Sequence, residues 1–164
     1  MTLWERHSGL VALIALVGLA LDQALKLWLL FGYGLGMSGP VALTPFLDIV
    51  LVWNRGISYG LFQQYSELER WALAGFAVLA TIAIWLWAAA ARRFITSLSL
   101  ALILAGAIGN GIDRLVFGAV IDFVHFHVGS FSWYVFNIAD VWIVAGALGL
   151  VYDWATDRGG DATK

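Results

Sequence analysis

Asp122 and Asp140 are the two residues of this sequence whose surroundings point most directly to chemistry. They stand in two successive apolar segments, and neither has a basic residue beside it. Two carboxylates that meet from separate segments cannot both ionise easily where the dielectric constant is low, so one keeps its proton while the other acts as a base. This arrangement activates water for peptide hydrolysis. On residue types alone, proton or cation transport is a second function that these carboxylates could serve.

Other polar residues stand within or at the ends of apolar segments, where an ionised side chain costs on the order of 2.5–3.5 kcal/mol. Asp22 and Lys26 are four residues apart, so they share one helical face and can form an ion pair that lets both charges sit at depth. Asp113 is next to Arg114 at a helix end, and we interpret these two as a pair at the membrane interface. Three asparagines accompany the charges: Asn54, Asn110 and Asn137.

Two histidines raise the question of a metal site. His125 and His127 are near Asp122, and residues i and i+2 of a strand face the same way. A catalytic zinc ion takes three protein ligands, however, and the sequence has no HExxH pattern. We therefore interpret the histidines as interfacial residues and expect neither a metal nor another cofactor. The GxGD signature of other two-aspartate proteases is also missing, because residues 34–36 are followed by Met37.

The composition places these residues in a membrane protein. Of the 164 residues, 62% are apolar and 12% are charged, about half the roughly 25% of soluble domains. The mean hydropathy is +0.86, and a soluble domain of this size could not bury so much apolar surface. The net charge of −2 comes without a basic run, which gives no support for nucleic-acid binding. Because there is no cysteine, disulfides, thiolate metal sites and cysteine nucleophiles are excluded.

The apolar segments predict an all-α membrane protein, a bundle of four transmembrane helices that forms a single domain over residues 1–164. The first segment begins like a secretory signal peptide but continues without a clear cleavage site, so we expect a retained helix. Ser66 and Glu69 fit a capping box at the start of the second helix. The predicted helices span about 9–31, 67–91, 94–117 and 134–153.

Short runs of β-branched and aromatic residues predict a small extracytoplasmic β-hairpin, in a β-rich segment of about 40–62. We expect its strands over 46–53 and 57–62, around the turn-forming residues 54–56. The segment of about 118–133 is too interrupted for a span, and a partly strand-like loop is expected there. Small residues near the end of the third helix suit close helix packing: Ala105, Gly106, Gly109 and Gly111.

Four spans put both termini on one side of the membrane. Arg92 and Arg93 lie in a very short connection, so the positive-inside rule predicts cytoplasmic termini. The helix ends that carry the polar residues then gather at the outer face. A transporter needs polar residues through both halves of the bundle, and no inverted repeat of the kind many carriers have is detectable. A purely structural subunit leaves the cost of Asp140 unexplained, so the distribution favours a peptidase.

Five short motifs, taken in order, resemble one family over residues of about 10–152. They are LDQALK (21–26), VWNRGISYG (52–60), GAIGNGIDRL (106–115), VIDF (120–123) and FNIAD (136–140). Together they resemble the bacterial lipoprotein signal peptidases, also called signal peptidase II. The resemblance implies a four-helix inner-membrane bundle with an extracytoplasmic β-cradle and a short helix. It also implies an aspartic endopeptidase that removes the signal peptide of diacylglyceryl-modified prolipoproteins, cutting just before the lipid-bearing cysteine.

The resemblance assigns expected roles to the polar residues. Asp122 and Asp140 match the catalytic pair of the family. The remaining matches would support the site or position substrate: Asp22, Lys26, Asn54, Gly56, Asn110, Arg114 and Asn137. The second motif departs from the Asn-x-Gly-Ala-Ala-Phe of many members, since Asn-Arg-Gly-Ile-Ser-Tyr stands here, so contacts of the cradle can differ.

The resemblance also implies the protein's surroundings. The expected partners are prolipoprotein substrates and membrane lipid, with no nucleic acid, and we expect a monomer. The expected location is the bacterial inner membrane, which the chain crosses several times, with its active site near the extracytoplasmic face.

Overall fold

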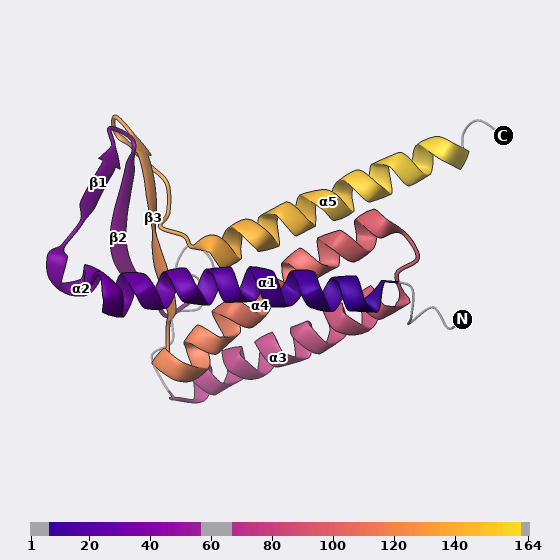
Figure 1. Cartoon of the computed structure of the whole chain (residues 1–164), viewed down its shortest axis with the longest axis horizontal. Coiled ribbons are helices and arrows are strands. Elements are labelled where there is room, and N and C mark those ends of the chain that lie inside the picture. The colour runs from indigo at the N-terminus through magenta and orange to yellow at the C-terminus, as the bar shows by residue number, and fades with distance from the viewer. Residues whose placement is uncertain (1–6, 57–66, 162–164) are drawn as a thin grey trace.

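The computed structural model describes residues 7–56 and 67–161. Four long helices form a bundle with a small sheet at one end, and α1 begins and α5 ends at the opposite end (Figure 1). In chain order the elements are α1 (Ser8–Leu27), the π-helical turn η2 (Trp28–Gly32), α2 (Leu35–Ser38), β1 (Val41–Thr44), β2 (Leu47–Asn54), α3 (Glu67–Ala90), α4 (Phe94–Phe117), β3 (Val120–Val128), β4 (Phe131–Ser132) and α5 (Ile138–Asp161).

The burial pattern of the helices is that of a membrane protein. Within the described residues, four stretches are long and apolar enough to cross a membrane: Ser8–Gly32, Trp71–Ala90, Phe94–Phe117 and Ile138–Asp157. Large apolar side chains such as Leu16, Leu79 and Leu148 point outward, whereas Asp22 and Lys26 are fully buried. Outward apolar faces suit lipid as solvent. The predicted four-helix membrane fold with a small sheet is therefore confirmed.

Helix α4 is central, because α1, α3 and α5 each pack on it. Small side chains make these contacts close. A Cβ atom on Gly106 would collide with the carbonyl oxygen of Ala139 in α5, and one on Gly109 would come within 2.6 Å of Asp22 Oδ2. Close helix packing, expected from the small residues of this segment, therefore occurs at these two glycines, while Gly111 has nothing within 4 Å of such an atom.

The sheet is antiparallel with strand order β1-β2-β3-β4. The side chains of β3 point alternately to the two faces of the sheet. Ile121 and Phe123 are buried against Leu29 of η2 and Leu35 of α2, which attaches the sheet to the helices. Asp122 lies on the other face of the strand. A register irregularity in β2 between Ile49 and Val52 accompanies this pairing.

The predicted hairpin is only partly described. The expected strand over 46–53 is β2, and its partners are β1 and β3. The second expected arm, 57–62, lies outside the described residues, as does the capping residue Ser66. The segment of about 118–133, expected to be a partly strand-like loop, forms the strands β3 and β4.

The bounds predicted for the fourth helix, about 134–153, are wrong at both ends. It begins only at Ile138, because the backbone of Phe136 forms two hydrogen bonds with Val124 of β3, at 2.8 and 3.0 Å, and is extended. It continues to Asp161, because Arg93 holds this end of the helix. The guanidinium group of Arg93 contacts Asp153 at 3.0 Å and Asp157 at 2.7 Å.

We predict that Gly106→Ala destabilises the protein by about 1–3 kcal/mol, since the added methyl group must push α5 away from α4. Thermal unfolding in detergent measures the effect. Gly111→Ala is the matched control on the same helix, because its methyl group meets open space. Equal melting temperatures for the two variants would show that the α4–α5 contact is not as tight as described.

Candidate active site

Asp122 stands near the start of β3 and is only 2% exposed. Both of its carboxylate oxygens accept a hydrogen bond from an asparagine. Asn137 Nδ2 donates to Oδ1 at 2.6 Å, and Asn54 Nδ2 donates to Oδ2 at 3.0 Å. These amides fix the orientation of the carboxyl group without adding charge.

Asp140 is held by the first turn of α5. Asn137 precedes the helix, and its side-chain oxygen accepts the backbone N–H of Asp140 at 3.0 Å. In return, Asp140 Oδ2 accepts the backbone N–H of Asn137 at 3.2 Å. This reciprocal pair has the geometry of a capping box, which explains why the helix begins here. Asn110 Nδ2 of α4 donates to the other oxygen, Oδ1, at 2.9 Å.

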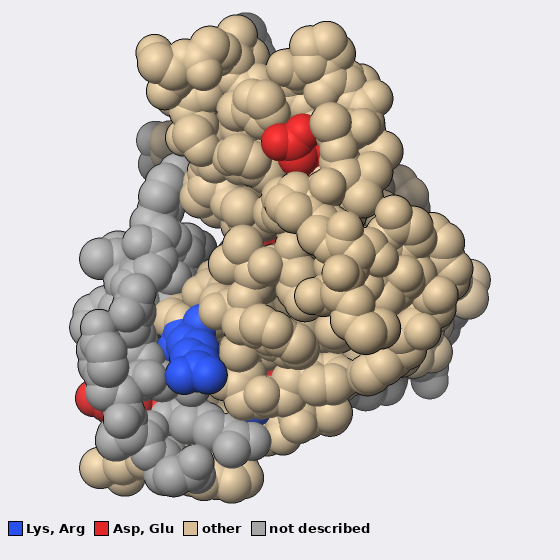
Figure 2. Space-filling view, turned by 90° about the vertical axis from the view of Figure 1, so that its left-hand side faces the viewer, with Lys and Arg blue, Asp and Glu red and all other residues tan. Residues whose placement is uncertain are grey.

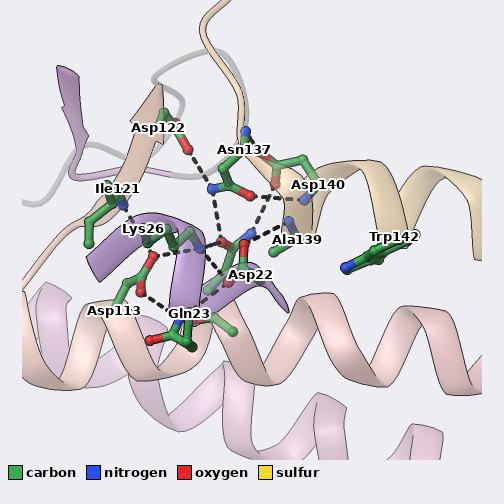
Figure 3. A network of polar contacts seen from close by, with 12 residues as sticks. Asp22, Gln23, Lys26, Asp113, Ile121, Asp122, Asn137, Ala139, Asp140 and Trp142 are labelled. Carbon is green, nitrogen blue, oxygen red and sulfur yellow. Dashed lines mark hydrogen bonds and ion pairs between the residues drawn. The ribbon is translucent and has the colours of Figure 1, made fainter. Parts of the chain in front are cut away.

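Asn137 joins the two carboxylates (Figure 3). The same amide nitrogen that donates to Asp122 also donates to Asn110 Oδ1 at 3.0 Å, and Asn110 donates to Asp140. The two aspartates therefore belong to one hydrogen-bonded network, although they come from β3 and α5. Their predicted convergence is what the structure shows.

Both aspartates line one cavity of about 210 Å³ at the sheet end of the bundle. Asn54, Asn110 and Arg114 contribute polar groups to it, and α3 contributes an apolar wall: Leu73, Phe76, Ala77 and Ala80. Burial raises the pKa of Asp122 to about 7, and the charge of Asp140 adds to the shift. The cavity can thus hold a water molecule or a peptide beside a carboxyl group that keeps a proton near neutral pH.

A cluster of buried charged side chains around Lys26 adjoins the aspartate pair through Asn110. Its ammonium nitrogen is 2.8 Å from Asp22 Oδ2, 2.8 Å from Asp113 Oδ2 and 3.1 Å from Asn110 Oδ1. Lys26, Asp22 and Asp113 are all fully buried. The expected pairing of Asp22 with Lys26 is therefore confirmed, as part of a larger set of contacts.

The pairing expected between Asp113 and Arg114 at the interface is wrong. Neighbouring residues of a helix point about 100° apart, so the two side chains diverge. Asp113 shares the inward face of α4 with Gly109 and Asn110 and meets Lys26 there. Arg114 instead donates to the carbonyl oxygens of Gly56, at 2.9 Å, and Asn110, at 3.1 Å.

The ion cluster reaches the elements that carry the aspartates. Asp22 Oδ1 accepts the backbone N–H of Ala139 in the first turn of α5, at 3.0 Å, where the helix dipole favours an anion. Asp113 Oδ2 accepts the backbone N–H of Ile121, the residue before Asp122, at 3.2 Å. The cluster thus anchors both the start of α5 and β3.

Two residues of this network were not expected from the sequence. Asp113 was assigned to the interface, and Gln23 received no role. The amide of Gln23 donates to Asp22, to Asp113 and to the carbonyl of Gly109, at 3.0–3.2 Å. The i, i+3, i+4, i+7 spacing of Gly106, Gly109, Asn110 and Asp113 is the sequence signal that places Asp113 inward.

The remaining candidate residues complete the site. Asn54 Oδ1 accepts the backbone N–H of Gly56 at 3.0 Å, so the turn after β2 is closed by its own asparagine. Arg114 ties that turn to α4 through Gly56. The structure therefore brings together all nine sequence-predicted site residues. His125 and His127 are not among them, since they lie on the opposite face of β3 from Asp122 and their carboxylate neighbour is Asp48.

A bundle of membrane-spanning helices in which a buried aspartate and a half-buried aspartate line one cavity defines a class, the membrane-embedded aspartic peptidases. Comparison with known proteins gives the family. The sequence profile described as "Signal peptidase (SPase) II" matches residues 14–156. The chain belongs to the signal peptidase II family.

Curated relatives agree with this assignment, and a solved structure shares the fold. The chain is 55% identical over 147 residues to the lipoprotein signal peptidase of Methylorubrum extorquens (strain PA1), with 90% of this chain and 85% of that protein covered. It is 54% identical over 148 residues to that of Methylobacterium sp. (strain 4-46), with 89% and 90% covered. The fold is similar to that of a bacterial membrane enzyme solved by the in meso method, with a TM-score of 0.81, 24% identity, and 95% and 93% of the two chains covered.

We predict that Lys26→Met destabilises the protein by about 3–5 kcal/mol, because it leaves Asp22 and Asp113 as uncompensated buried charges. The measurement is unfolding in detergent for Lys26→Met, Asp113→Asn and the double variant. In the Lys26→Met background, Asp113→Asn should cost less than it does alone, since it removes one stranded charge. Strictly additive costs would mean that the two groups do not interact.

Proposed function

We propose that this protein removes the signal peptide of diacylglyceryl-modified prolipoproteins by hydrolysing the peptide bond just before the lipidated cysteine, with Asp122 and Asp140 as the acid–base pair. Membership of the signal peptidase II family supports the reaction. The observation that carries the residue assignment is that both aspartates line one cavity and are joined through Asn137 and Asn110.

In the proposed mechanism the pair holds one proton near neutral pH. The ionised carboxylate takes a proton from the attacking water, and the protonated one donates to the carbonyl oxygen of the scissile bond. The proton taken from water then goes to the leaving amine as the C–N bond breaks, and a hydroxyl group of the tetrahedral intermediate returns its proton to the other carboxylate, which releases the new carboxyl group and restores the pair. Because the two groups titrate as a unit, the roles belong to the pair.

The asparagines and Arg114 serve this mechanism in different ways. All four carboxylate oxygens accept a hydrogen bond, three from the side chains of Asn54, Asn110 and Asn137 and one from the backbone N–H of Asn137. The aspartates therefore do not need to reorganise when substrate enters. Arg114 lines the cavity while its described hydrogen bonds go to backbone carbonyls. Its charge can then stabilise the partial negative charge on the scissile carbonyl oxygen until the proton is transferred to that oxygen.

The proposal also includes a placement in the membrane. We place the sheet end at the extracytoplasmic face of the bacterial inner membrane and the termini in the cytoplasm, and the protein acts as a monomer. Most of the described surface at the sheet end is uncharged (Figure 2), which suits contact with the lipid headgroup region. The apolar α3 wall of the cavity lets an apolar signal segment approach while the acyl chains of the substrate remain in lipid.

Asp122→Asn and Asp140→Asn should each lower the cleavage rate by at least about 10²–10⁴-fold without unfolding the bundle, because each removes one proton-transfer group. The assay is a gel shift of a purified diacylglyceryl-modified prolipoprotein in detergent. Asp157→Asn, at the opposite end of the bundle, is the control and should cleave like wild type. Near-normal turnover by either dyad variant would remove the pair from the mechanism. If folded wild-type protein left the substrate uncut, the peptidase proposal itself would fail, and proton flux in liposomes would be the next measurement.

The pH dependence of cleavage should show a basic limb near pH 7, because the pair loses its shared proton as Asp122 titrates with a pKa of about 7. The hydrogen bond from Asn54 favours the ionised form of Asp122, so Asn54→Ala should raise this pKa and move the limb to higher pH. The readout is the pH profile of kcat/KM, not the rate alone.

The control for this profile addresses histidine, the side-chain type that most often changes charge between pH 5 and 8, of which the chain has three. A variant with His7, His125 and His127 all replaced by glutamine should keep the basic limb. Loss of the limb in that variant, or a shift to lower pH in Asn54→Ala, would show that Asp122 does not produce it.

A further inference from the structure

A second group of chemically active side chains lies on the sheet, apart from the aspartate pair. Asp48 of β2 is directly opposite His125 of β3, and His127 is two residues further along the same face. Asp122 is on the other face of β3. The three side chains are each about one quarter exposed, so a small ion from the solvent can reach them.

The distances within this group are those of a metal-binding site. Asp48 Oδ2 is 3.7 Å from His125 Nδ1 and 2.9 Å from His127 Nε2. All three ligand atoms lie within 4.8 Å of one another. Ligands about 2.0–2.1 Å from a tetrahedral zinc ion are about 3.3 Å apart, and the two measured distances bracket that value.

The hydrogen bonds of the histidines within the described residues do not involve the nitrogen atoms that face Asp48. His125 Nε2 is 2.8 Å from Ser132 Oγ of β4, so an N–H on Nε2 can be held there while the Nδ1 lone pair faces Asp48. A hydrogen bond on the far ring nitrogen is the usual way in which a metal-binding histidine is oriented.

His127 Nε2 supplies the second ligand atom. It is buried and close to Asp48 Oδ2, yet it has no partner in hydrogen-bond geometry among the described residues. An approach to 2.9 Å without hydrogen-bond alignment is what two ligands aimed at a common third point would show. The two histidine rings are also stacked, with centroids 5.1 Å apart, so both stand side by side over Asp48.

We propose that Asp48, His125 and His127 bind one divalent transition-metal ion of the zinc type, with water completing the coordination. Two imidazoles and one carboxylate favour such an ion over Mg²⁺ or Ca²⁺, which take oxygen ligands. The ion cross-links β2 to β3 and, through Ser132, reaches β4. It stiffens the sheet that carries Asp122 but takes no part in hydrolysis, because its ligands lie on the opposite face of β3.

The test is Zn²⁺ binding to the full-length protein in detergent, prepared without a histidine tag, treated with EDTA and separated from the chelator. Equilibrium dialysis against ZnCl₂ should give one ion per chain, and bound Co²⁺ should show the intense visible absorption of a four-coordinate site. The variants are Asp48→Asn and His125→Gln/His127→Gln, each expected to bind at least about tenfold more weakly. His7→Gln, the remaining histidine, is the matched control and should bind like wild type.

Several outcomes would overturn the proposal. They are no stoichiometric Zn²⁺ binding by wild type, undiminished binding in Asp48→Asn, or equal loss in His7→Gln. If the double histidine variant does not fold, the Co²⁺ spectrum of wild type and its loss in Asp48→Asn decide the question. Zn²⁺ should also raise the melting temperature of wild type while EDTA leaves prolipoprotein cleavage unchanged. Cleavage that stops with EDTA and returns with Zn²⁺ would refute the structural role.

Discussion

The ammonium group of Lys26 is the charge on which the architecture depends. Taking an ion out of water costs several kcal/mol even after a protein relaxes, and ionisable residues within a membrane bundle offset that cost by pairing with one another. Lys26 is tolerated because Asp22, Asp113 and Asn110 surround it at 2.8–3.1 Å. These partners come from α1 and α4, so the ion cluster can form only when the two helices are correctly aligned. The glycine at 109 permits the approach, since a side chain there would displace Asp22.

Asparagine side chains separate the ammonium group of Lys26 from Asp122 and Asp140. A lysine or arginine hydrogen-bonded directly to Asp122 would favour its ionised form and lower its pKa. Asparagine amides are used instead. They fix the orientation of the carboxyl oxygens and leave the pKa of Asp122 near 7, where a carboxyl group can both give and accept protons. Lys26 fixes the position of Asn110 through a hydrogen bond, and the neutral amide group of Asn110 then contacts Asp140.

Much of this was predictable from the sequence, for identifiable reasons. Uncharged runs of 19 or more residues can only be spans in so apolar a chain, and polar residues are expensive enough in lipid that their gathering at one end indicates a site. The predictions that failed concerned the direction of single side chains on a helix and the ends of a helix. Asp113 was paired with its neighbour Arg114, although adjacent helical residues diverge. The start of α5 was placed too early, because the apolar residues before Asn137 serve a backbone pairing with β3 that no periodicity reveals. Asp48 was overlooked because its partners are distant in the chain and become neighbours only through the register of β2 and β3.

Strand β3 shows why such a site needs the whole fold. Its alternation places Ile121 and Phe123 in the apolar contact with η2 and α2 and turns Asp122 to the cavity. A slip of one residue would bury the aspartate in that apolar contact and remove it from Asn54 and Asn137. Asp113 opposes the slip by accepting the backbone N–H of Ile121, and Phe136 opposes it by pairing with Val124. Register is therefore set from α4 on one side and from the residues before α5 on the other. Since Asp140 is positioned by the cap that begins α5, the two carboxylates meet only after α1, α4, β3 and α5 have all assembled.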